Sequence, residues 1–178
     1  MKKIFISIVL ILGIALVALF IINGKSNYDP KKYSLKIAPE TKPFGVGSTI
    51  QFTLPDQFGK THTNKDTKKL IFAFTKDAGH TVKAFMQNKP KGYLESKGAV
   101  IVLDVSPMPT VILNTFALPD LKKSNFSMML IYDGKMAKKL EEGLDKSKIA
   151  VITIKDSKVA KIDYATTQNE LGKLVGSE

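Results

Sequence analysis

The sequence contains no cysteine, no arginine and no tryptophan. Without cysteine, the chain forms no disulfide, supplies no thiolate nucleophile, builds no cysteine zinc site and carries no lipid on an N-terminal cysteine. Its only histidines are His62 and His80, which is too few for the usual zinc sites of proteins. We therefore predict no metal, no cofactor and no thiol-based activity.

The absence of arginine bears on nucleic-acid binding. All 27 basic residues are lysines, against 16 acidic residues, which gives a net charge of +11. Arginine is the usual reader of guanine edges and phosphates because its planar fork binds them with two hydrogen bonds. The lysines are also spread thinly along the chain and are not massed in one run, with pairs at 31–32, 68–69, 122–123 and 138–139. We predict no nucleic-acid partner, a solvated lysine surface, and at most weak contact with anionic lipids.

Residues 4–22 form the longest hydrophobic run, with 19 positions and no charge. A helix of this length spans about 28 Å, close to the hydrocarbon thickness of a bilayer. The run is longer than the apolar core of a typical signal peptide, follows Met-Lys-Lys, and ends without a small-x-small cleavage site. We predict a cytoplasmic head (1–3) and an uncleaved transmembrane signal-anchor (4–22) in a bacterial inner membrane, with the C-terminal part in the periplasm.

Two other placements stay open. Cleavage would release a soluble periplasmic protein. Lysines that follow the run weaken the charge asymmetry across it, so a reversed anchor with a cytoplasmic domain is the other alternative.

Residues 23–46 contain Pro30, Pro39 and Pro43 and show little periodicity outside 33–37. This composition predicts an extended tether. A single domain is expected over 47–178, since this length and an apolar content of 44% are ordinary for one globular unit.

Buried strands and helices alternate through this domain, which predicts an α/β layered architecture. Strands are expected at 48–54, 61–63, 70–75, 99–105, 127–132, 149–154 and 159–164. Helices are expected at 79–96 with a break at Pro90, at 107–118, at 135–142, and after a cap at Thr166 or Thr167.

Three stretches resemble a known family. They are 52–60 (FTLPDQFGK), 127–140 (SMMLIYDGKMAKKL) and 150–159 (AVITIKDSKV). In this order they resemble the peroxiredoxin and TlpA branch of thioredoxin-like proteins, and most closely the small periplasmic YtfJ-type proteins. The resemblance implies a thioredoxin-like central mixed sheet flanked by helices, with an N-terminal hairpin and a peroxiredoxin-type inserted strand and helix.

The resemblance also implies where a reactive centre would lie. In the family it is a Cys-x-x-Cys at the start of the helix after the first central strand, where helix N–H groups stabilise a thiolate. Aligned without gaps, that motif falls on Gly79-His80-Thr81-Val82, and the family's cis-proline falls near Lys148. Both thiols and the proline are missing, so redox chemistry is not expected and no catalytic residue is predicted.

The residues left at that corner are the only candidate ligand site: Thr75, Lys76, Asp77, His80 and Thr81. Free N–H groups at a helix start, with an ammonium and an imidazole, suit an anion; an Asp77–His80 acid–base couple is a bolder version. The simpler interpretation is that Thr75 or Asp77 caps the helix and that His80 is solvated. His62, among threonines in a polar hairpin, is also expected to be exposed.

Two functions from different classes follow. The first is a non-catalytic, membrane-anchored thioredoxin-like module that acts through contacts with an envelope protein in the periplasm. The second is a binder of, or an enzyme for, a small anionic ligand at the degenerate helix start.

Overall fold

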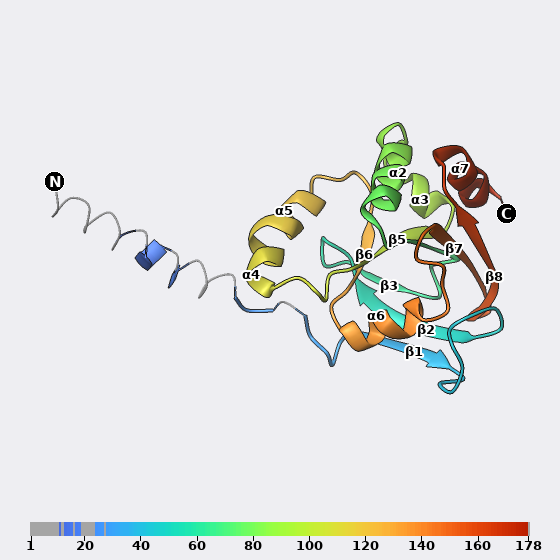
Figure 1. Ribbon diagram of the computed structural model, residues 1–178, viewed down its shortest axis with the longest axis horizontal. Helices are drawn as coiled ribbons and strands as arrows, with labels where there is room; N and C mark the ends of the chain where they lie inside the picture. Colours follow the sequence, from blue (N-terminus) through green and yellow to red (C-terminus); the bar gives the residue numbers. More distant parts are fainter. Residues whose placement is uncertain (1–10, 12, 16, 19–23, 27, 178) are drawn as a thin grey trace.

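The computed structural model describes residues 11, 13–15, 17–18, 24–26 and 28–177 (Figure 1). The predicted head at 1–3 and most of the predicted transmembrane run at 4–22 lie outside the described residues. Within the described part, no helix combines the length and the apolar character needed to cross a membrane.

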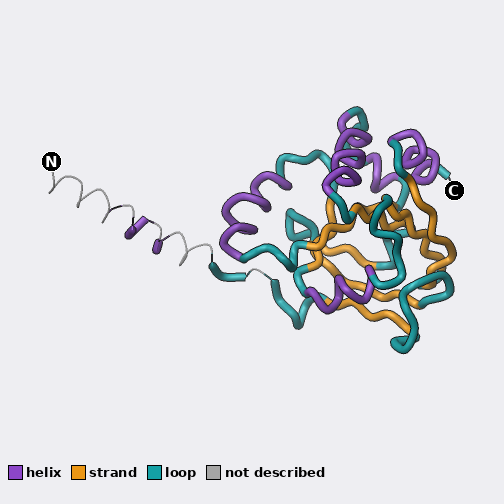
Figure 2. The backbone as a smooth tube through the Cα atoms, in the orientation of Figure 1, coloured by secondary structure: helices purple, strands orange, loops and turns teal. Residues whose placement is uncertain are grey.

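One mixed sheet forms the centre of the domain, and helices flank it (Figure 2). Its strands are β1 (Ser34–Ala38), β2 (Thr49–Pro55), β3 (Thr61–Thr63), β4 (Lys69–Ala73), β5 (Ala99–Asp104), β6 (Met128–Ile131), β7 (Ile149–Lys155) and β8 (Lys158–Ala165). The spatial order is β1-β2-β8-β7-β4-β5-β6, with β3 paired to β2. β4, β5 and β6 run parallel, whereas the other pairs are antiparallel.

Helices cover both faces of this sheet. They are α2 (Lys76–Gln87), α3 (Tyr93–Ser96), α4 (Thr110–Ile112), the π-helix η1 (Leu113–Ala117), α5 (Leu118–Leu121), α6 (Gly134–Glu141) and α7 (Gln168–Gly176). Side chains from α2, α3 and α7 pack together in a core on one face. The other face is covered by α6 and by the β1–β2 hairpin. The predicted central mixed sheet with flanking helices, the β2–β3 hairpin and the additional β6–α6 unit are confirmed.

The central strands are buried on both faces, which explains their continuous apolar sequences. In β4, Leu70 and Phe72 face the core under α6 and the hairpin, whereas Ile71 faces the core under α2 and α7. Successive strand residues point to opposite faces, so a strand covered on both sides needs an apolar residue at every position. Met129 in β6 is likewise only 1% exposed.

The predicted helix at 79–96 is two helices, and the first begins three residues earlier than expected. Thr75 is the N-cap of α2, so the helix starts at Lys76. The break falls at Pro90, as predicted, and α3 resumes after Gly92, which has a left-handed φ of 83°.

The helix predicted at 107–118 runs from Thr110 to Leu121 as α4, η1 and α5. Pro119 lies inside it. A proline within an α-helix clashes with the carbonyl four residues earlier, here that of Thr115, and lacks an N–H to donate. The wider π turn of η1 ends at Ala117, two residues before this proline, and accommodates it.

The segment 23–46 differs most from expectation, because it is not simply a tether. β1 pairs with β2 over five residues, and Tyr33 and Phe44 are 7% and 2% exposed. A Cβ placed on Gly143 would lie 1.6 Å from the Phe44 carbonyl oxygen, so this loop packs closely on the end of α6. The prolines and lysines obscured a strand in which only Ile37 is fully buried.

Candidate functional site

The start of α2 is built by a capping threonine. β4 ends at Ala73, and Thr75 adopts an extended backbone with φ −107° and ψ 158°. Its Oγ1 accepts a hydrogen bond from the Ala78 N–H at 3.1 Å, which satisfies one of the donors that any helix start leaves unpaired. Of the two predicted caps, the structure uses Thr75.

The five predicted site residues lie along the first two turns of α2. Thr75, Lys76, Asp77 and His80 are exposed and Thr81 is half-buried. The Thr81 hydroxyl donates to the Asp77 carbonyl at 3.0 Å. In the described part of the chain, no hydrogen bond or ion pair joins the Asp77 and His80 side chains, so the acid–base couple is not assembled in this structure.

The positions aligned with the family's thiols do not lie at the first turn. Gly79 and Val82 are the fourth and seventh residues of α2, and Val82 is 5% exposed. Lys148, near which the family's cis-proline aligns, precedes β7. In the described part of the chain, the cis peptide is at Ala38–Pro39, at the end of β1. Neither the helix start nor the strand that faces it holds the groups of a thiol centre.

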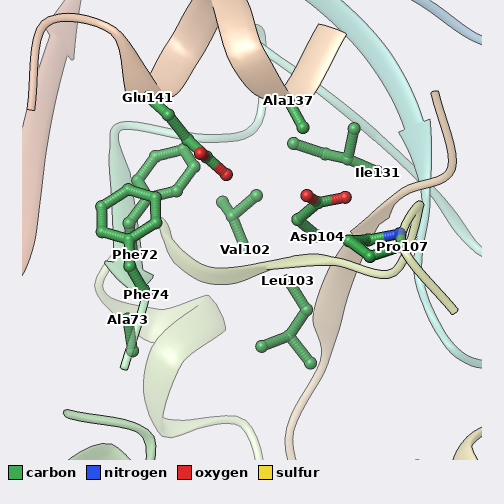
Figure 3. Close-up of a pocket in the computed structure, with 10 residues that line it drawn as sticks. All are labelled: Phe72, Ala73, Phe74, Val102, Leu103, Asp104, Pro107, Ile131, Ala137 and Glu141. Atoms are coloured by element: carbon green, nitrogen blue, oxygen red, sulfur yellow. The ribbon is translucent and has the colours of Figure 1, made fainter. Parts of the chain in front are cut away.

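A small cavity opens beside the helix start, at the carboxyl ends of β4 and β5 and against α6 (Figure 3). Its volume is about 220 Å³, below the roughly 300 Å³ at which small-molecule sites usually begin. The charged groups on its wall are the carboxylates of Asp104 and Glu141. Each has a partner in the protein: Asp104 accepts from the Ser106 N–H at 2.9 Å, and Glu141 pairs with Lys146 at 2.5 Å. Two carboxylates do not suit an anion.

A second, lysine-rich groove lies between the end of β1 and α6. Its volume is about 330 Å³, and it is lined by Ile37, Pro39, Glu40, Lys42, Lys135, Lys138, Lys139 and Glu142. Lys139 lies 3.7 Å from Glu40, and Lys138 lies 4.0 Å from Glu142. These exposed pairs are weak, and four lysines against two glutamates leave a positive excess that suits anionic groups.

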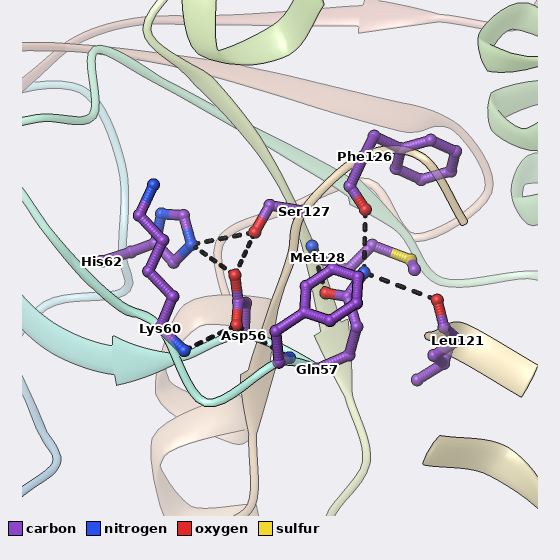
Figure 4. A network of polar contacts seen from close by, with 9 residues as sticks. Asp56, Gln57, Lys60, His62, Leu121, Phe126, Ser127 and Met128 are labelled. Carbon is purple, nitrogen blue, oxygen red and sulfur yellow. Dashed lines mark hydrogen bonds and ion pairs between the residues drawn. The ribbon is translucent and has the colours of Figure 1, made fainter. Parts of the chain in front are cut away.

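The prediction that His62 is exposed is wrong. This side chain belongs to a buried polar cluster with Asp56 and Ser127 (Figure 4). These three residues are 8%, 3% and 8% exposed, respectively. His62 Nε2 lies 3.2 Å from Asp56 Oδ2 and 3.0 Å from Ser127 Oγ, and the Ser127 hydroxyl donates to Asp56 Oδ2. The cluster joins the β2–β3 hairpin to the start of β6.

This Ser-His-Asp set is not a hydrolytic triad. In such a triad the carboxylate and the hydroxyl contact different nitrogens of the imidazole, so that the histidine can take the serine proton. Here both contact Nε2, and the serine hydroxyl is committed to the carboxylate. Gln57 extends the same join, donating to the Phe126 carbonyl and accepting from the Met128 N–H, each at 2.8 Å. The cluster is a structural clamp.

Electrostatics agree with a clamp. Burial raises the pKa of Asp56, but hydrogen bonds from Ser127, His62 and the N–H groups of Lys60 and Phe58 outweigh it and hold that pKa below its ordinary value. The carboxylate is therefore stabilised in its charged form.

No protein-family model matches the chain, and no curated protein matches it. Solved structures do. One is a hypothetical protein from Sinorhizobium meliloti 1021, 16% identical with a TM-score of 0.47, over 77% of this chain and 88% of that one.

Two others carry thiol-related names. The thioredoxin domain of a thiol-disulfide oxidoreductase from Bacteroides vulgatus is 15% identical, with a TM-score of 0.45, over 75% of this chain and 99% of that one. A peroxiredoxin-like protein from Aquifex aeolicus is 14% identical, with a TM-score of 0.43, over 79% and 92%. The fold is thioredoxin-like. This assignment rests on the strand order and the helix positions of this chain. The chain has no cysteine.

Strand alternation is the signal that could have revealed the buried cluster. Thr61–Thr63 was expected as a strand, and its middle residue must face the opposite side from its neighbours. His62 is indeed buried between two half-buried threonines. Its partner Ser127 is 65 residues away in sequence, and the sequence offered no sign of that contact.

Proposed function

We propose that this chain is a non-catalytic thioredoxin-like module, anchored in a bacterial inner membrane by residues 4–22, that acts through protein contacts on the periplasmic side. The observation that carries the proposal is that the sheet and helices of a thioredoxin-like domain are present, whereas the thiols of its reactive centre are absent. The helix that would present the thiols is capped by Thr75 and packed on the sheet, yet the chain has no cysteine to place at its first turn.

The same geometry argues against a replacement catalytic centre at the corner. Asp77 and His80 are solvated and not paired with each other, so nothing in the first two turns of α2 activates a nucleophile. A thioredoxin-like domain without a reactive centre can still bind a partner through its exposed surface. Val46 and Phe58 are 68% and 56% exposed and lie outside the corner, which makes them candidate contact positions.

Site-specific photocrosslinking in intact membranes tests the contact. A photoreactive residue at Phe58 or Val46 is expected to give a discrete adduct with one envelope protein. A photoreactive residue at exposed Lys155 is the matched control and is expected to give none. Uncrosslinked chain at every position, or disulfide reductase turnover by the purified protein, would contradict the proposal.

The membrane anchor is tested separately by alkaline carbonate extraction. The chain is expected to stay with the membrane pellet. Each lysine placed at the centre of a membrane helix costs about 2.5–3.5 kcal/mol of insertion free energy, so a Leu12→Lys, Leu16→Lys variant is expected to be extracted. Release of the unmodified chain would refute the anchor.

The second candidate function is binding of a small anion at the start of α2. What favours it is the set of first-turn N–H groups beside exposed Lys76 and His80, of which the Thr75 hydroxyl caps only that of Ala78. Inorganic phosphate is then expected to raise the melting temperature, and a Lys76→Ala, His80→Ala variant should lose that rise. Lys83→Ala, in the next turn of α2, is the control; equal shifts in all three proteins would exclude this site.

A further inference from the structure

Three large apolar side chains lie exposed at the start of the helical segment formed by α4, η1 and α5. Met108, Ile112 and Phe116 are 42%, 46% and 62% exposed. Ile112 and Phe116 are four residues apart on the helical segment, close to one turn, so they share one side of it. Met108 lies in the bend two residues before α4. We call these three side chains the apolar ridge. Clustered exposed hydrophobics of this kind mark a surface that contacts another apolar phase or a partner.

The helical segment α4–α5 lies on the side of the domain where residues 28–33 join it (Figure 1). The Asn114 side chain, on the same helical segment but about half a turn round it from Ile112 and Phe116, donates a hydrogen bond to the Lys25 carbonyl at 2.9 Å. Lys25 comes three residues after the hydrophobic run ends at Ile22. Three residues reach at most about 10–11 Å, so an anchor formed by the run would end within that reach of the Lys25 contact with this helical segment.

The chain is also fixed to the domain immediately after this contact. The Tyr28 ring stacks on Tyr33 and Tyr132, with centroid separations of 5.7 and 5.3 Å. The connection between the run and the packed domain is therefore a few residues long. The polar interface on each side of a bilayer is about 5–7 Å thick, so a helix tied to Lys25 lies at headgroup level when the run spans the membrane.

Charge on this segment fits an anionic bilayer surface. Lys122 and Lys123 follow α5 and are exposed, and Lys25 lies at the hydrogen-bonded contact. One of these charges is partly offset, because Lys123 pairs with Asp120 at 3.1 Å. An apolar ridge with lysines at its end is the pattern of helices that lie in the plane of a membrane interface.

We propose that the apolar ridge of Met108, Ile112 and Phe116 lies in the headgroup region of the bilayer that holds residues 4–22, on a surface containing anionic lipid. This inference rests on the proposed membrane anchor. It adds a second point of attachment, which fixes the orientation of the domain relative to the membrane.

The lack of cysteine makes the test clean, since a single introduced thiol is the only labelling site. Spin labels are placed on Ile112→Cys and Phe116→Cys in the full chain, reconstituted into vesicles of phosphatidylcholine and phosphatidylglycerol. Lys155→Cys, at the exposed end of β7, is the control. Labels at 112 and 116 are expected to be relaxed by oxygen and to lose access to a water-soluble nickel reagent, whereas the label at 155 keeps nickel access.

The outcomes separate the inference from the anchor. Labels at 112 and 116 that behave like the label at 155, in a chain that resists carbonate, overturn the ridge and leave the anchor intact. Shielding that appears in native membranes and not in lipid vesicles also overturns it, because a protein then covers the ridge. Release by carbonate with both ridge labels in lipid refutes the anchor and supports the ridge.

Discussion

Substitution of Asp56 by asparagine isolates the contribution of one buried charge. Asp56 Oδ1 accepts from the N–H groups of Phe58 and Lys60 at 2.9 and 2.8 Å. Its Oδ2 accepts from the Ser127 hydroxyl and lies 3.2 Å from His62 Nε2. An asparagine of the same shape keeps the first two contacts and replaces the second oxygen with an amide NH₂.

The expected loss follows from the two contacts at Oδ2. A hydrogen bond to a charged group contributes about 1.5–3 kcal/mol, and the new amide recovers part of that by donating to its neighbours. Asp56→Asn is therefore expected to lower the free energy of unfolding by about 3 kcal/mol at pH 7. Asp66→Asn, on the exposed turn after β3, is the control and should change it by no more than about 0.5 kcal/mol.

The pH dependence gives an independent readout. Because hydrogen bonds hold the pKa of Asp56 below its ordinary value, its stabilising effect is complete above the unfolded-state pKa of about 3.9 and is lost as the pH falls through the lower folded-state pKa. The gap between the wild type and Asp56→Asn should therefore close in acid.

Urea unfolding in mild detergent, followed by far-UV circular dichroism because the chain has no tryptophan, measures both effects. A variant within about 0.5 kcal/mol of wild type at pH 7, or a gap that stays constant into acid, would refute the clamp.

Three further predictions concern the packing of the domain. Thr75→Ala should cost about 1 kcal/mol of unfolding free energy by removing the cap of α2, and an unchanged melting curve would contradict that role. Gly143→Ala should cost about 1–3 kcal/mol by overpacking, since its new Cβ meets the Phe44 carbonyl. Gly79→Ala is the control, because nothing lies within 4 Å of its new Cβ, and it should raise the free energy of unfolding by about 0.5–1 kcal/mol. Equal effects of the two substitutions in urea unfolding would show that the segment 23–46 does not pack on the domain. Lys69→Met should speed hydrogen exchange in α7, because buried Lys69 donates to carbonyls in its last turn, and unchanged exchange would show that those bonds contribute little.

The central strands could be predicted because burial on both faces requires apolar residues at consecutive positions. β4, β5, β6 and β7 are covered on both faces, so each contains a run of four or more consecutive apolar residues, which indicates a buried strand or helix. β1 is different, because it lies at the sheet edge with a single fully buried residue and prolines nearby. Pattern alone does not separate such a strand from a linker.

The candidate corner was predictable in place but not in detail. Alternation of strands and helices located the start of α2, but the alignment put the thiol positions at Gly79 and Val82, one turn too far into the helix. Cap chemistry decides this boundary, and Thr75 competed with Asp77 on equal terms in the sequence. The buried cluster depends on a contact between His62 and Ser127, which only the folded sheet brings together.

Packing of residues 28–46 on the domain limits where a partner of the proposed module can lie. With the chain fixed to the domain from Tyr28, five residues, 23–27, separate the domain from the hydrophobic run. They reach at most about 17 Å, and a domain of this size has a radius of gyration of about 15 Å. If the chain is anchored as we propose, this short connection confines the surfaces of the domain to within roughly 50–60 Å of the bilayer, whereas a long tether would let the domain range further. The proposed envelope partner must then itself be held at the membrane or reach down to it, which is why crosslinking in intact membranes, and not in a soluble extract, is the assay that can find it.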